Sequence, residues 1–138
     1  MLKHFQVPDD IAVRVNVDSL RAVTERIFMK CGVSESEANL GADVLMFADQ
    51  SGIDTHGVSN MLRSYVSAYN SGTLNPEPTL HIVKETPSTA TIDGDGGLGL
   101  MIAPKAMDIA IAKAKKVGTG VVAVRNSGHL GAAGYHAM

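Results

Sequence analysis

The hydrophobic positions change their period along the chain. Near the start, β-branched residues alternate with Ala, Arg and Asn, and this period of two predicts a short strand over residues 11–17. Apolar positions then recur every three or four residues. They predict a first helix that has Asp18 as its N-cap and stops at Gly32.

Two more helices follow in the pattern. Ser34 and Glu37 have the spacing of a capping box, so we expect a second helix from there to about Gly52. A third is predicted over residues 60–70 and closed by Gly72, with an apolar inward face made by Met61, Leu62, Tyr65, Val66 and Tyr69. Residues 1–74 are therefore predicted to form a helical N-terminal subdomain with a short leading strand.

The spacing of hydrophobic residues changes after Gly72. Asn and Pro residues over 75–78 indicate an extended connection and a subdomain boundary. Short apolar runs on either side of a turn at residues 86–88 predict a β-hairpin. A helix is predicted from about Pro104 to Lys116, with the proline in its first turn.

The remaining pattern predicts a C-cap at Gly118, a strand over 121–124 and the opening of another helix over 132–138. This last segment has no C-cap, and an isolated helical turn is marginal in water. We therefore expect the natural chain to continue past Met138. The predicted fold class is α/β (α+β), with a mixed-sheet domain that begins at residue 75 and is incomplete at 138.

Composition narrows the function classes. Hydrophobic residues make up 45% of the 138 residues, enough to build a core. The net charge is -2 and no basic run reaches five residues, so we expect neither nucleic acid nor a membrane surface as a partner. A small anionic substrate, which needs only one or two cations, stays open.

Cysteine usage and hydropathy indicate the compartment. Cys31 is the only cysteine, and a lone thiol fits a reducing, cytoplasmic location. Residues 1–10 lack the apolar stretch of a signal peptide, and no window of eighteen apolar residues predicts a transmembrane helix. The histidines and the cysteine lack metal-ligand spacing, so no metal is expected.

Two His-centred segments carry the candidate chemistry. Residues 54–58 place His56 between two helices, and residues 125–135 place His129 directly after a strand. Glycines beside each His let a ligand approach the backbone, and an imidazole can take and give a proton near neutral pH. Hydride transfer at a carbinol carbon needs such a group on the oxygen. The alternative, that either His only caps a helix or fills a polar position, stays open.

The segment 94–99 matches the dinucleotide pattern G-x-G-x-x-G. The strand before it is too polar for the buried first strand of a parallel sheet, and no acidic residue follows Val124, where Arg125 and Asn126 stand. We therefore expect a glycine-rich turn that leads into a packed helix, not a cradle for a pyrophosphate.

These segments resemble a known family. Residues 54–58, the turn at 93–96 with the helix after it, and above all residues 126–135 are similar to the malate/L-lactate dehydrogenase family of the non-Rossmann type. The family also contains ureidoglycolate and sulfolactate dehydrogenases and cyclic-imine reductases. The resemblance covers nearly the whole chain. It implies NAD or NADP as cofactor in a fold unlike the Rossmann domain, and a homodimer with sites near the subunit boundary.

The resemblance also assigns residues. The family's catalytic acid/base His falls on His129, and its first motif places Thr55 and His56 in the substrate and nicotinamide site. Ser127 and Gly131, together with His56, fall on the side of the cofactor.

This chain departs from the family pattern at two positions. Many members carry Arg where Asn60 stands, so Arg63, one helical turn on, is the candidate for the substrate carboxylate. A family Tyr is replaced by Ser64, with Tyr65 next. These departures leave the substrate open.

Three hypotheses for the function follow. The first is an oxidoreductase that transfers a hydride between NAD(P) and a small 2-hydroxy or 2-oxo acid such as malate or lactate. The second is a ureidoglycolate dehydrogenase or cyclic imino-acid reductase of the same family. The third is a noncatalytic nucleotide-binding module. Family chains are more than twice this long, so we expect these residues alone to be inactive.

Overall fold

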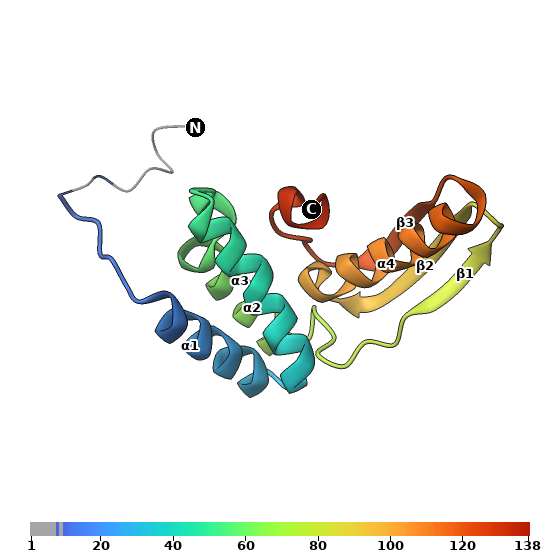
Figure 1. The fold of residues 1–138 in the computed structure, drawn as a ribbon. Coiled ribbons are helices and arrows are strands. Elements are labelled where there is room, and N and C mark those ends of the chain that lie inside the picture. The colour runs from blue at the N-terminus through green and yellow to red at the C-terminus, as the bar shows by residue number, and fades with distance from the viewer. Residues whose placement is uncertain (1–7, 9) are drawn as a thin grey trace.

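The computed structural model describes residue 8 and residues 10–138. Three helices and a short 3-10 turn come first, and a sheet with one long covering helix follows (Figure 1). The elements are α1 (Val17–Lys30), α2 (Glu35–Gln50), η2 (Asp54–His56), α3 (Val58–Asn70), β1 (His81–Glu85), β2 (Thr89–Gly97), α4 (Gly99–Val117), β3 (Val121–Ser127) and α5 (Ala133–His136).

The predicted leading strand is wrong. Residues 11–16 form no strand, and Val17 already belongs to α1. Ile11 is 66% exposed and Val13 84% exposed. An alternating pattern gives a strand only where a neighbouring strand accepts its hydrogen bonds, and no strand in the described part of the chain pairs with this segment.

The three N-terminal helices begin and end close to the predicted positions. The N-cap of α1 is Asn16 rather than Asp18, because the Asn16 side chain accepts a hydrogen bond from the Ser19 amide at 2.9 Å. The Ser34 hydroxyl caps α2 as predicted, accepting from the Glu37 amide at 3.4 Å. The Glu37 carboxylate does not close the capping box, since it pairs instead with Lys105 at 2.7 Å.

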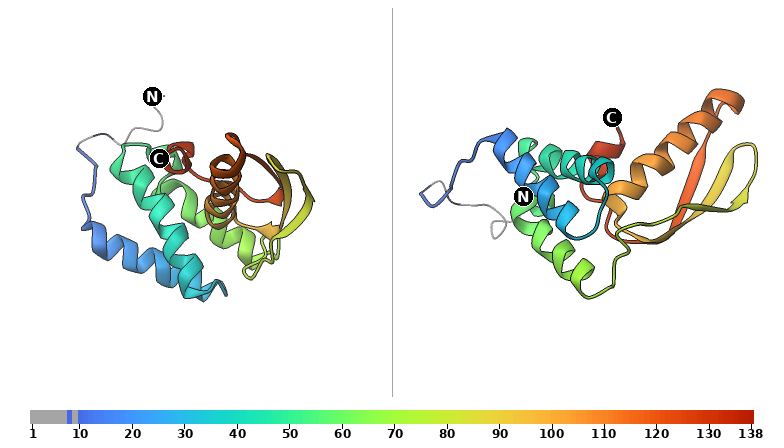
Figure 2. Two further views of the ribbon diagram at one scale, coloured as in Figure 1. Left: turned by 45° about the vertical axis from the view of Figure 1, so that its right-hand side comes forward. Right: turned by 90° about the horizontal axis from the view of Figure 1, so that it is seen from below.

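The sheet has three strands in the order β1-β2-β3. β1 and β2 are antiparallel and form the predicted hairpin, whereas β2 and β3 are parallel and are joined through α4. Parallel neighbours require such a crossover. Figure 2 shows α4 lying across one face of this mixed sheet.

The helix α4 starts earlier than the sequence predicted. It begins at Gly99, so Pro104 lies inside the helix and not in its first turn. Its first residues are drawn into the core, where Leu100 and Ile102 are fully buried. Gly118 ends the helix in the left-handed conformation with φ 87°, as predicted.

The glycine-rich segment is mostly strand and not the predicted turn. β2 continues through Gly97, with an irregularity between Asp93 and Gly97 where Asp95 and Gly96 have φ of 51° and 69°. A Cβ on Gly97 would lie 2.6 Å from Pro78 Cγ. At this position the glycine therefore makes room for the protein's own chain.

Two clusters form the core. The larger one joins α1, α2 and α3 to the start of α4, with Phe28, Leu45, Leu98 and Leu100 at its centre. The smaller one, built on Ile92, Ile102 and Ala106, lies between α4 and the sheet. The helical part and the sheet are thus packed together through the N-terminal end of α4. Within the described residues, no helix has the length and hydropathy needed to cross a bilayer.

Candidate active site

The loop after β3 is held tightly on both sides. The Gly128 amide donates to the carbonyl of Gly97 at the end of β2, at 2.8 Å. Gly99, at the start of α4, lies so close that a Cβ there would come within 2.7 Å of the backbone carbonyl carbon of His129. The end of one strand and the beginning of one helix therefore fix the backbone that carries His129.

His56 ends the 3-10 turn between α2 and α3. Its Nδ1 lies 2.7 Å from the Thr55 hydroxyl. The turn itself is tied to α3 because the Asn60 side-chain amide donates to the Asp54 carbonyl at 2.6 Å. With Nδ1 engaged by Thr55, the Nε2 atom of His56 is left for other partners.

The structure brings the two imidazoles together. The ring centroids of His56 and His129 are 5.3 Å apart, with an angle of 32° between the planes. Two loops from different parts of the chain thus meet at one place.

Tyr65 completes this cluster, although from the sequence it was only an inward position of the third helix and the neighbour of Ser64. Its hydroxyl lies 2.8 Å from Nδ1 of His129, and its ring is almost completely buried in α3. In the sequence Tyr65 is one of several apolar positions on the inward face of a helix, and only the packing of α3 against the loop after β3 gives it a partner. The Nε2 atom of His129 remains free to exchange a proton.

Burial sets the protonation of the cluster. Partial burial of the ring, and then the nearby charge of His56, lower the pKa of His129 below its usual value. Burial raises the pKa of the Tyr65 hydroxyl, so that it stays protonated. At neutral pH the pair is therefore a neutral imidazole hydrogen-bonded to a neutral phenol.

The other candidate residues lie at different places. The Ser127 hydroxyl donates to the carbonyls of Gly97 and Gly128 at 3.3 and 3.4 Å. Gly131 has φ 82° and faces the core, where a Cβ would come within 2.7 Å of Val44 and 2.6 Å of Leu100. Its lack of a side chain therefore serves internal packing.

Arg63 is not part of the cluster. It is exposed and forms no ion pair with any residue in the described part of the chain. It precedes Tyr65 by two positions on α3, which is a rotation of about 200° around the helix axis. Because Tyr65 points at His129, Arg63 points away from it.

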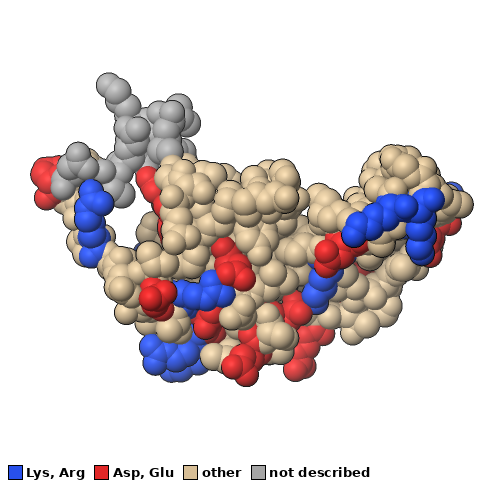
Figure 3. Space-filling model, viewed as in Figure 1, with Lys and Arg blue, Asp and Glu red and all other residues tan. Residues whose placement is uncertain are grey.

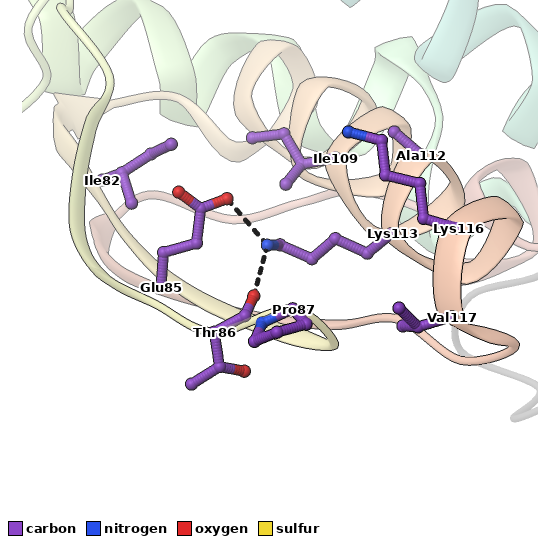
Figure 4. A pocket seen from close by; sticks show the side chains of 9 residues that line it. All are labelled: Ile82, Glu85, Thr86, Pro87, Ile109, Ala112, Lys113, Lys116 and Val117. Atoms are coloured by element: carbon purple, nitrogen blue, oxygen red, sulfur yellow. Dashed lines mark hydrogen bonds and ion pairs between the residues drawn. The ribbon is translucent and has the colours of Figure 1, made fainter.

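A cavity of about 580 Å³ lies elsewhere, between the hairpin and the C-terminal half of α4 (Figure 4). The buried Lys113 crosses it, and its ammonium donates to Glu85 at 2.7 Å and to the Thr86 carbonyl at 2.8 Å. None of the candidate site residues lines this cavity. We place the candidate site at the paired imidazoles, because there two groups that exchange protons near neutral pH lie side by side.

The face of the molecule seen in Figure 3 carries both acidic and basic side chains. Figure 3 shows Lys and Arg side chains scattered among acidic ones on the face in view. Among residues 8 and 10–138, no three His, Cys, Asp or Glu side chains converge as a metal site would require.

The described residues form a mixed α/β fold in which the rings of His56 and His129 lie side by side, close to the end of a parallel strand pair. The chain belongs to the malate/L-lactate dehydrogenase family, whose model matches residues 15–138. It is 45% identical over 130 residues to a malate dehydrogenase of Pyrococcus abyssi, covering 94% of this chain and 36% of that one. It is 49% identical over 110 residues to an L-sulfolactate dehydrogenase of Methanocaldococcus jannaschii, covering 80% and 32%.

A solved structure agrees with this assignment. Malate dehydrogenase from Pyrococcus horikoshii OT3 superposes with a TM-score of 0.91 and 42% identity, covering 96% of this chain and 38% of that one. The chain thus spans about a third of the length of the relatives that it matches.

Proposed function

We propose that the protein is an oxidoreductase that moves a hydride between a nicotinamide cofactor and a small 2-hydroxy or 2-oxo acid such as malate or lactate. The observation that carries the proposal is the pair of imidazoles 5.3 Å apart, one of them hydrogen-bonded to Tyr65. The names of the relatives, which include malate, sulfolactate and hydroxycarboxylate dehydrogenases, support the same substrate class.

His129 is the proposed proton acceptor and donor. With Nδ1–H donating to the Tyr65 oxygen, the Nε2 lone pair is free to take the hydroxyl proton of a 2-hydroxy acid. In the reverse direction, Nε2–H returns the proton to the carbonyl oxygen. The lowered pKa of His129 favours the neutral ring, which is the form that accepts the proton.

The proposed cofactor is NAD or NADP, which when bound accepts or donates the hydride. The residues present fit the polar edge of a nicotinamide. Thr55 is bonded to Nδ1 of His56 and leaves Nε2 available to a nicotinamide. The Ser127 hydroxyl donates its hydrogen bond to the Gly97 carbonyl, and its oxygen can still accept a hydrogen bond from the cofactor. We propose that Gly131 contributes to the cofactor side of the site by holding the backbone after His129 close to Val44 and Leu100. We propose that the 94–99 segment is not a pyrophosphate cradle, because Gly97 and Gly99 face the protein's own chain.

Substrate binding is proposed for Thr55 and His56, because the His56 ring lies beside His129 and Thr55 is hydrogen-bonded to His56. The orientation of Arg63 argues against its contact with a substrate carboxylate within the same copy of the chain. We further propose a homodimer, supported by the exposed Val121 and Val124 on the edge strand β3, and a cytoplasmic location, supported by the lone thiol of Cys31. Residues 1–74 and 75–138 are the proposed subdomains.

A panel assay tests the function. The full-length protein is mixed with NADH or NADPH and a set of 2-oxo acids, ureidoglycolate in the oxidative direction, and a cyclic imino acid. Turnover with malate- or lactate-type acids is expected. Turnover only with ureidoglycolate or the imino acid would favour the second family activity, and binding without turnover would favour a nucleotide-binding module. We expect residues 1–138 on their own to be inactive.

A further inference from the structure

Asp49 is a carboxylate outside the imidazole cluster that contacts the turn carrying His56. It lies in the last turn of α2, and its Oδ2 accepts a hydrogen bond from the Val58 amide at 3.0 Å. Val58 opens α3, and the N-cap of that helix, Gly57, has no side chain to offer. The first amides of a helix need acceptors and favour a negative charge. Asp49 therefore caps α3 from a neighbouring helix.

Gly57 shows how closely Asp49 fits. Its backbone, with φ -84° and ψ -177°, is one that any residue adopts, so conformational freedom does not explain the glycine. A Cβ on Gly57 would overlap the Asp49 carboxylate. Gly57 is buried and directly follows His56. The carboxylate and the missing side chain together fix the backbone next to the imidazole.

The surroundings of Asp49 do not favour its charge. Burial is the largest influence and raises the pKa of its carboxyl; the hydrogen bond from the Val58 amide lowers the pKa by less, and the charge of Asp54, a smaller influence again, raises it. Asp93, by contrast, has a lowered pKa because amide and side-chain donors surround it. Because its surroundings disfavour the charged form, we attribute to Asp49 a role in placing the neighbouring backbone more than a role in stability.

We propose that Asp49 is a positioning residue that holds His56 against His129 by capping α3 and filling the space over Gly57. The same cap orients α3, which carries the Tyr65 hydroxyl to Nδ1 of His129. The significance of the two imidazoles rests on the proposed function, but the positioning itself can be measured without turnover.

The test uses Asp49→Ala in the full-length protein, with Asp108→Ala as its matched control because Asp108 is an exposed carboxylate on α4. The pKa of the His129 imidazole is read from its NMR titration. The His56 charge lowers the pKa of His129, so displacement of His56 should raise it. Loss of a negative charge alone would lower the pKa, so a rise identifies a change of geometry. In parallel, kcat should fall by roughly 10- to 100-fold, because small misplacements of reacting groups cost that much.

Two further variants keep the test decisive. Asp49→Asn retains an oxygen that can accept from Val58 and loses only the charge, so the His129 pKa should not rise and kcat should stay near its original value. Gly57→Ala should raise the pKa as Asp49→Ala does, and it carries the test alone if Asp49→Ala fails to fold. An unchanged or lowered His129 pKa in a folded Asp49→Ala or Gly57→Ala protein overturns the proposal. A raised pKa in a protein that turns over no substrate in any form leaves the positioning standing and removes the proposed function.

Discussion

The Tyr65 hydroxyl lies 2.8 Å from Nδ1 of His129 and joins the middle of α3 to the loop that follows β3. A phenol that stays neutral can accept a hydrogen bond from Nδ1–H without adding a charge beside the ring. It therefore fixes which nitrogen of His129 faces outward while leaving the pKa to burial and to His56. Four predictions follow from this cluster and from the backbone that holds it.

Replacement of His129 by Ala should lower kcat by roughly 10²- to 10⁴-fold, the usual contribution of a general acid/base. Cofactor affinity and melting temperature should change little, because the side chain is only partly buried and makes one hydrogen bond to a described residue. Steady-state kinetics and a thermal melt measure both quantities. A folded variant with near-normal turnover would exclude His129 from the mechanism.

Replacement of Tyr65 by Phe keeps the buried ring and removes only the partner of Nδ1. Because one hydrogen bond contributes about 1 kcal/mol, kcat should fall by up to about tenfold. Tyr69→Phe is the matched control: this tyrosine is one turn on in α3 and its hydroxyl has no hydrogen bond to a described residue. Equal effects of the two substitutions would show that the Tyr65 hydroxyl has no special role.

The pH dependence follows from the lowered pKa of His129. Oxidation of a 2-hydroxy acid needs the neutral imidazole, so its kcat should rise with pH through that pKa and level off above it. Reduction of a 2-oxo acid needs the protonated ring, so its kcat should fall over the same range. The inflection should lie below the ordinary histidine value of about 6.5. An inflection above that value in both directions would contradict the assignment.

Replacement of Gly99 by Ala should displace the loop that carries His129, because its Cβ would press on the backbone of Gly128 and His129. Overpacking of this kind costs about 1–3 kcal/mol of unfolding free energy, and kcat should fall as well. Gly134→Ala is the control, since a Cβ there meets only the Phe47 ring at an ordinary 3.4 Å. Chemical denaturation measures the unfolding free energy of both variants, and steady-state kinetics measures their kcat. Equal stability of the two variants would contradict the close contact at Gly99.

The sequence by itself determined the local elements wherever local chemistry decides them. Ser34 caps α2 through its own neighbouring amide, and Gly118 ends α4 because glycine tolerates a positive φ. The hairpin was also predicted correctly, because its two strands and the turn between them are consecutive in the chain. The two histidines stood out as candidates because glycines flank both.

Tertiary structure decided everything that depends on distant partners. The alternating residues 11–17 form no strand because no described strand pairs with them, and the glycine-rich segment continues β2 because β3 lies parallel beside it. Tyr65 and Asp49 gain their roles from contacts with His129 and Val58, which lie 64 and 9 positions away in the chain. Arg63, two positions before Tyr65 on α3, projects from another side of the helix, and its contact with a substrate carboxylate stays a prediction. Hydrogen bonds and packing depend on which residues are close in space, and the order of residues along the chain does not state this directly.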